Sequence, residues 1–199
     1  MPEDAVLHAE RDHLARSHSA LAAMRARAAD WTTAIGGDHV STQFLRQQLY
    51  RRRESLADDP DVPLFFGRID YATALGAEAD EVFHIGRRHV EAAIGGDPLV
   101  MDWRAPMALP FYRARPGEPM GVELRRRFGF QHGAITAYED EHLADARSTG
   151  TSALLEAEIE RPRTGPMRDI VATIQPDQDV LVRTDRDITL AIQGAPGTG

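Results

Sequence analysis

Leucine returns at every seventh residue near the start of the chain, and this spacing limits most strongly how the chain can fold. The first set of heptad positions is Leu7, Leu14, Leu21 and Ala28. The second set is Glu10, Ser17, Met24 and Trp31. Because residues three and four positions apart share one helix face, the spacing predicts a single long helix over residues 3–34. Its seam is interrupted by the polar Glu10 and Ser17.

A glycine pair ends this helix, and a second helix is expected to run back beside it. Gly36 and Gly37 break the pattern, and helical spacing resumes over residues 41–57. Two heptad-like segments joined by a short turn predict an antiparallel helical hairpin, here a coiled coil. The apolar seam is too small for a globular core, so the hairpin over residues 1–59 is expected to project as an arm.

The pattern then changes from helical to strand-like. Residues 58–63 form an acidic linker whose two prolines stop the helix. Short runs separated by turn residues predict strands over 64–72, 81–90, 99–103, 110–115 and 121–137. The last run is expected to fold back near Gln131. We therefore assign residues 60–143 to a small β-rich domain, as an antiparallel sheet or a partly closed barrel.

The end of the chain carries the clearest chemical signal. Residues 144–168 are predicted to be a linker with a short helix over 152–160, and two short helices are expected over 167–173 and 177–183. An apolar, β-branched run over 188–192 is typical of a buried parallel strand. The residues after it are Gly194, Ala195, Pro196, Gly197, Thr198 and Gly199.

These six residues match the opening of the phosphate-binding pattern G-x-x-x-x-G-K-[ST]. Glycines allow backbone N–H groups to turn toward phosphates without a Cβ in the way. The alternative is an ordinary Gly/Pro loop after a strand. Residues 169–199 are thus predicted to open a P-loop, RecA-like α/β domain, and the chain as a whole is predicted to be α+β.

The expected nucleotide site is incomplete, because the chain stops one residue before the P-loop lysine. Gln178 lies upstream of the motif, and its amide offers the donor and acceptor that fit an adenine edge. A glutamine in a polar helix is the alternative. We predict that Gln178 and residues 194–199 bind nucleotide, with ATP and Mg²⁺ held in a full-length parent. No catalytic residue and no bound cofactor are expected in this fragment, which cannot hydrolyse ATP alone.

Composition and charge exclude further kinds of site and of partner. The net charge of −8 argues against nucleic-acid affinity over the whole surface. Arg125 and Arg127 share one strand face, where a solvated face and contact with phosphates both stay open. Asp102 and Arg104 are better explained as an ion pair than as catalytic groups. The chain has no cysteine, its histidines lack metal-site spacing, and no apolar run could span a membrane, so a cytoplasmic protein without a metal site is expected.

Several short motifs together resemble the HelD family. In chain order they are Gly67-Arg68-Ile69-Asp70, His84-Ile85-Gly86-Arg87-Arg88-His89-Val90, Asp97-Pro98-Leu99-Val100-Met101-Asp102-Trp103-Arg104-Ala105-Pro106, Pro110-Phe111-Tyr112-Arg113, Arg126-Arg127-Phe128-Gly129, Thr136-Ala137-Tyr138-Glu139-Asp140-Glu141 and Asp169-Ile170-Val171-Ala172-Thr173-Ile174-Gln175. All 23 basic residues are arginine, which indicates a GC-rich coding background, and the resemblance implies an actinobacterial member of the family.

The resemblance implies a superfamily 1, UvrD/Rep-related ATPase that binds bacterial RNA polymerase. In that family the N-terminal hairpin enters the secondary channel of the polymerase, and ATP turnover is linked to its release or recycling from DNA or RNA. Some members also protect against rifamycins. Two other functions stay open: the N-terminal part of a conventional superfamily 1 DNA helicase, and a non-enzymatic polymerase-binding module that acts through its hairpin alone.

Overall fold

The computed structural model describes residues 2–33, 39–59, 62–72, 81–143, 153–154, 171–184, 189 and 191–193. Two helices come first, α1 (Pro2–Thr33) and α2 (His39–Ser55). The strands are β1 (Phe65–Tyr71), β2 (Val82–Gly86), β3 (Val90–Glu91), β4 (Pro98–Asp102), β5 (Val122–Gln131) and β6 (Ala134–His142). The short helical segments are η1 (Pro106–Ala108), α3 (Leu109–Arg113), η2 (Val171–Thr173) and α5 (Pro176–Val182).

Within the described residues, six strands form one mixed sheet in the order β3-β4-β2-β1-β5-β6. Neighbouring strands are antiparallel except for β2 and β4, which run parallel. The β5–β6 hairpin turns at His132 and Gly133, which both have positive φ, at 51° and 74°. Two consecutive positive φ values suit the twist of a tight hairpin. The α+β class and the turn near Gln131 are thus confirmed.

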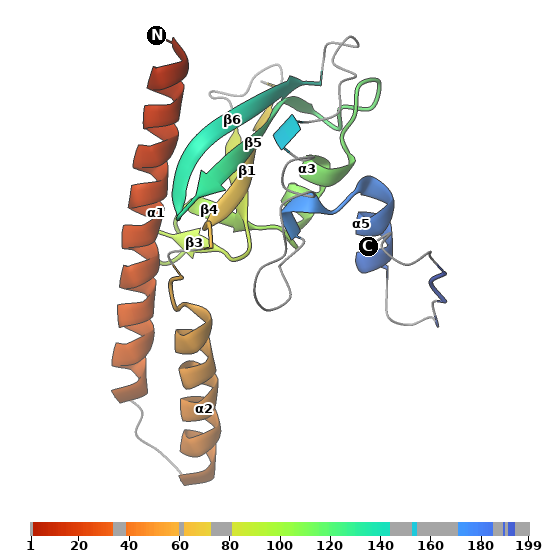
Figure 1. Ribbon diagram of the computed structural model, residues 1–199. Coiled ribbons are helices and arrows are strands. Elements are labelled where there is room, and N and C mark those ends of the chain that lie inside the picture. Colours follow the sequence, from red (N-terminus) through yellow and green to blue (C-terminus); the bar gives the residue numbers. More distant parts are fainter. Residues whose placement is uncertain are drawn as a thin grey trace.

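The seam of α1 packs on the sheet (Figure 1). The buried seam residues are Leu14, Leu21, Met24 and Ala28, and they share one core cluster with Phe65, Val90, Val100, Phe128 and Ile135. The seam therefore contributes to a globular core, and the expectation that it could not is wrong. A coiled coil is not confirmed. The domain boundaries 1–59, 60–143, 144–168 and 169–199 stay predictions.

Helix α2 runs back beside the second half of α1, beyond the sheet (Figure 1). Its C-terminal end reaches the core through the buried Leu56. The glycine pair predicted to form the turn falls in residues 34–38, which lie outside the described residues.

On the opposite face of the sheet, η1 and α3 share a second core cluster with the strands, and α5 lies beside α3 (Figure 1). Phe111 of α3 is buried there, and a Cβ on Gly67 of β1 would lie 2.1 Å from its ring. Glycine at this position therefore allows α3 to approach the strand closely. The strand predicted over residues 110–115 is wrong. Pro110 opens a helical turn, where its missing N–H costs nothing, and both Phe111 and Tyr112 are buried.

Four further predictions from the sequence concern residues 81–90, Pro176, the P-loop strand and residues 152–160. The run over residues 81–90 is interrupted after Gly86 and divides into β2 and β3. Pro176 begins α5, as its place between two predicted helices suggested. Thr189 and residues 191–193 are not in a strand, so the P-loop strand is not confirmed. Of the helix predicted over 152–160, only Ala153 and Leu154 are described, and both are helical.

Because α1 packs on the sheet and α2 lies beyond it, substitution of a leucine on each helix is expected to change the stability by different amounts. Leu21 is fully buried between α1 and the sheet, whereas Leu45 on α2 is 44% exposed. Leu21→Ala is expected to lower the free energy of unfolding by about 2–5 kcal/mol, because it leaves a cavity in the core. Leu45→Ala is expected to change it by less than about 1 kcal/mol. Urea titration followed by circular dichroism measures both, and equal losses would contradict the shared core.

Candidate functional site

Gln178 is the described part of the predicted nucleotide site. It is half-buried in the first turn of α5, where its side-chain oxygen accepts a hydrogen bond of 3.1 Å from the backbone N–H of Gln175. The Gln175 side chain accepts from the backbone of Gln178, so the two residues form a reciprocal capping box. Residues 194–199 lie outside the described residues. The adenine-contacting role of Gln178 stays a prediction.

One acidic side chain, Asp179, holds α5 in place. Its carboxylate is fully buried and accepts hydrogen bonds of 2.6 Å from Nε of Arg113 on α3 and from Nε of Arg183. A buried carboxylate is costly unless it is paired in this way. We call Asp179, Arg113 and Arg183 the Asp179 clasp.

The clasp connects α5 to the motif around Trp103. Arg183 donates to the backbone carbonyls of Trp103 and Arg104, at 2.6 and 3.1 Å. Its guanidinium also lies 5.5 Å from the ring centre of Trp103 and 5.8 Å from that of Tyr112, within range of cation–π attraction. The helix that carries Gln178 is thereby fixed to the segment that follows β4.

The predicted ion pair of Asp102 and Arg104 is confirmed. Nη2 of Arg104 lies 2.6 Å from a carboxylate oxygen of Asp102, and Nε donates to the other oxygen at 2.8 Å. Its backbone N–H donates to the same carboxylate at 2.9 Å. The pair lies at the C-terminal end of β4, with one residue on each side of Trp103.

A second cluster fixes α1 to the sheet through Glu10. Oε1 of Glu10 accepts hydrogen bonds of 2.7 Å from Nη1 of Arg68 on β1 and from Nη1 of Arg126 on β5. Oε2 accepts from Nε2 of His84 on β2, also at 2.7 Å. The Glu10 side chain is 3% exposed. We call Glu10, Arg68, His84 and Arg126 the Glu10 cluster.

Further acids hold the arginines of the cluster in place. Asp70 accepts from Nε and Nη2 of Arg68, at 2.7 and 2.6 Å. Asp140 of β6 accepts from Nε and Nη2 of Arg126, at 2.6 and 2.7 Å. Such two-point pairs fix the guanidinium planes and aim the remaining N–H groups at Glu10.

The charges of the cluster shift its pKa values. Burial alone would raise the pKa of Glu10, but the hydrogen bonds from His84 and Arg68 and the charge of Arg68 outweigh it and lower the pKa to about 2. Burial lowers the pKa of His84 despite the opposing pull of Glu10. Glu10 is therefore ionised and His84 neutral near pH 7.

His13 extends the cluster along α1. Its ring stacks on that of His84 with centroids 3.7 Å apart, and its Nε2–H donates to the carbonyl of Leu99 at 2.7 Å. Burial and the neighbouring His84 lower the pKa of His13 to about 4. Ser17, the other polar seam residue, donates its hydroxyl to the His13 carbonyl at 2.8 Å, so it is satisfied within the helix.

The three consecutive arginines of β5 are structural. Arg125 and Arg127 do share one face, where both contact Glu141, and Arg125 also donates to two backbone carbonyls. Arg126 points to the other face, into the Glu10 cluster. The solvated face and the phosphate contact considered from the sequence are both wrong for this face, because Arg125 is buried and Arg127 mostly buried, and both contact Glu141.

The sequence did not identify Asp179 or Glu10 as a buried acid that positions a helix. Asp179 and Arg183 are spaced i, i+4 on one helix face, and this spacing could have indicated a pair. Arg113 could not have been found so, because it is 66 residues away. In the sequence Glu10 only interrupts the heptad seam, although it is the residue that aligns α1 on the sheet.

Two further properties concern the described residues alone. Among them, no group of histidine and acidic side chains could hold a metal ion. No helix among them is long and apolar enough to cross a membrane.

These features define an α+β domain in which one long helix is locked on a mixed sheet by buried ion pairs. The family model of the DNA helicase IV HelD N-terminal domain matches residues 7–154. The chain belongs to this family, and the resemblance inferred from its motifs is confirmed. A search of the curated proteins found none that matches.

The lowered pKa of His13 predicts loss of stability in mild acid. His13 takes up its proton near pH 6.5 in the unfolded state but only near pH 4 in the folded state. The free energy of unfolding therefore falls as the pH drops through this window. Because the ring is only partly buried, the loss of stability across this window is about 2 kcal/mol. His13→Gln keeps a hydrogen-bond donor and should flatten this slope, whereas His8→Gln on the exposed face should leave it unchanged. Denaturant titrations at several pH values test this, and parallel pH profiles for wild type and His13→Gln would refute it.

The Asp179 clasp predicts local detachment of α5 when its acid is removed. Asp179→Ala leaves Arg113 and Arg183 without their shared partner, so α5 should exchange its amide protons at least about tenfold faster. Asp177→Ala removes an exposed acid from the same helix and is the matched control. Hydrogen exchange followed by mass spectrometry measures both, and equal exchange in the two variants would show that the clasp does not hold the helix.

Proposed function

We propose that this chain is the N-terminal part of an ATP-dependent factor that binds bacterial RNA polymerase and helps to release or recycle it from nucleic acid. The observation that carries the proposal is the family match over residues 7–154. The motifs that resemble the HelD family support the polymerase as partner.

The arrangement of α1 suits a polymerase-binding arm. The first half of α1 is fixed to the sheet by the Glu10 cluster, and its second half extends past the sheet beside α2 (Figure 1). A helix of 32 residues is about 48 Å long. The part of α1 that lies past the sheet and beside α2 is anchored at one end by the core and by ion pairs, and can reach into a narrow channel such as the secondary channel of the polymerase.

The nucleotide site belongs to the same proposal. In the longer parent expected from the sequence, Gln178 contacts adenine and residues 194–199 hold the phosphates of ATP with Mg²⁺. The Asp179 clasp supports this assignment, since it fixes the Gln178 helix to α3 and to the segment that follows β4. Because α3 packs in turn against the strands through Phe111, a change at the nucleotide has a physical route to the sheet that carries α1.

A second candidate function is duplex unwinding by a conventional superfamily 1 helicase. The description of the matched family as DNA helicase IV favours it. Strand separation by the full-length protein in the absence of polymerase distinguishes it from polymerase release.

Binding to polymerase tests the leading proposal. Deleting α1 is unsuitable, because α1 closes the core. Leu49→Pro instead interrupts α2 in its middle, where proline removes a helical hydrogen bond, and Leu49→Ala is the control. We expect wild type and Leu49→Ala to bind core RNA polymerase in biolayer interferometry, and Leu49→Pro to lose at least about tenfold in affinity.

Two outcomes would contradict the proposal. One is the absence of polymerase binding by the wild-type chain, with its fold confirmed by circular dichroism. The other is equal binding by Leu49→Pro, which would place the contact outside the arm.

A further inference from the structure

Two sets of arginines among the described residues differ in their partners. Those on the sheet and on the helices of its second face are paired with acids: Arg68, Arg104, Arg113, Arg115, Arg125, Arg126, Arg127 and Arg183. Those on α2 are Arg46, Arg51, Arg52 and Arg53. All four α2 arginines are exposed, and among the described residues none of them makes an ion pair.

Helix α2 is therefore a positively charged element in a chain with a net charge of −8. Glu54 is its single acidic residue. Neutralised charges stabilise the fold where the arginines are buried, whereas unpaired, exposed cations leave a field that attracts acidic partners.

Two adjoining hollows lie along this charged helix. One, of about 380 Å³, lies between α1 and the end of α2. The other, of about 390 Å³, is lined by Arg46, Gln47 and Tyr50. Arg53 lines both, so the hollows meet at its side chain. We call the two together the α1–α2 groove.

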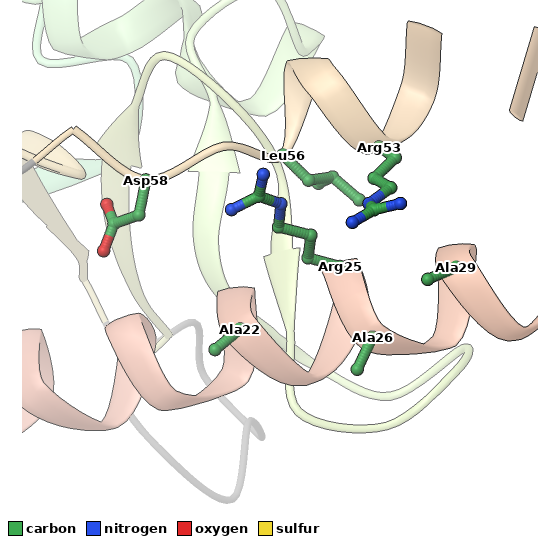
Figure 2. Close-up of a pocket in the computed structure, with 7 residues that line it drawn as sticks. All are labelled: Ala22, Arg25, Ala26, Ala29, Arg53, Leu56 and Asp58. Carbon is green, nitrogen blue, oxygen red and sulfur yellow. The ribbon is translucent and has the colours of Figure 1, made fainter. Parts of the chain in front are cut away.

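The groove has an apolar floor and a basic rim. Ala22, Ala26 and Ala29 of α1 lie along its floor, and Arg25 and Arg53 extend into the space between the helices (Figure 2). Tyr50 is 60% exposed at the other hollow. Asp58, at one end, is already paired with His18 at 2.6 Å.

Arg25 adds a second observation to the charge of the groove. Its Nε atom is buried and has no hydrogen-bond partner among the described residues. An unsatisfied buried donor is unfavourable, and an acceptor brought into the groove would relieve it. A carboxylate satisfies a guanidinium at two points and is the acceptor that suits this position best.

We propose that the α1–α2 groove docks an acidic segment of a partner protein. Its carboxylates pair with Arg25, Arg46 and Arg53, and an apolar side chain rests on the alanine floor. A nucleic-acid backbone would use the cations but leave the apolar floor uncovered, so the protein segment fits the lining better. The inference rests on the proposed function in taking the arm as the partner-binding part.

Two double variants with the same change in charge separate the groove from the general field of α2. Arg46→Ala/Arg53→Ala removes two groove arginines, and Arg51→Ala/Arg52→Ala removes two that do not line it. The probes are core RNA polymerase and a fluorescent peptide of alternating glutamate and leucine, with a single-stranded oligonucleotide as competitor. We expect the groove variant to weaken both interactions about tenfold or more and the control variant to weaken them less than about threefold.

The outcomes distinguish this inference from the proposed function. Equal losses in the two variants, or no loss in either, overturn the groove while polymerase binding still stands. If the wild type binds no polymerase, the peptide alone decides, and loss confined to Arg46→Ala/Arg53→Ala upholds the groove. Absence of peptide binding, or displacement of the peptide by the oligonucleotide at lower concentration than by unlabelled peptide, overturns it. Circular dichroism of each variant confirms that α2 is retained.

Discussion

The ionised carboxylate of Glu10 is the interaction on which the rest of this structure depends. It lies inside the interface between α1 and the sheet, where an isolated charge would be strongly unfavourable. Three donors from three different strands make it tolerable. Only one position of α1 along and around its axis satisfies all three at once. The cluster therefore contributes more to the placement of the helix than to net stability, since a buried ion pair repays its desolvation only in good geometry.

A second buried carboxylate, that of Asp179, positions another helix. That carboxylate is fully buried between Arg113 and Arg183, and it locates α5 as Glu10 locates α1. Glu10 thus attaches α1 directly to three strands, whereas Asp179 attaches α5 to α3 and, through Arg183, to the segment that follows β4.

The arginines of the sheet and those of α2 differ in what their charges contact. The arginines of β5 are matched by acids and fix the geometry of the sheet. The arginines of α2 have no such partners among the described residues and surround a groove with an apolar floor. The same residue type is therefore a structural element on the sheet and, in the proposed α1–α2 groove, a recognition element.

The sequence by itself determined the features that depend on local spacing. The heptad positions predicted α1 and its buried face, the residues near Gln131 predicted the β5–β6 turn, and the motifs predicted the family. Only the tertiary structure decided what covers that face, because Glu10 meets partners 58, 74 and 116 residues away. A polar residue in an apolar seam looks like a defect until those distant donors are brought to it. The physical reason is that burial of a charge is decided by three-dimensional neighbours, and periodicity records only which face is turned inward.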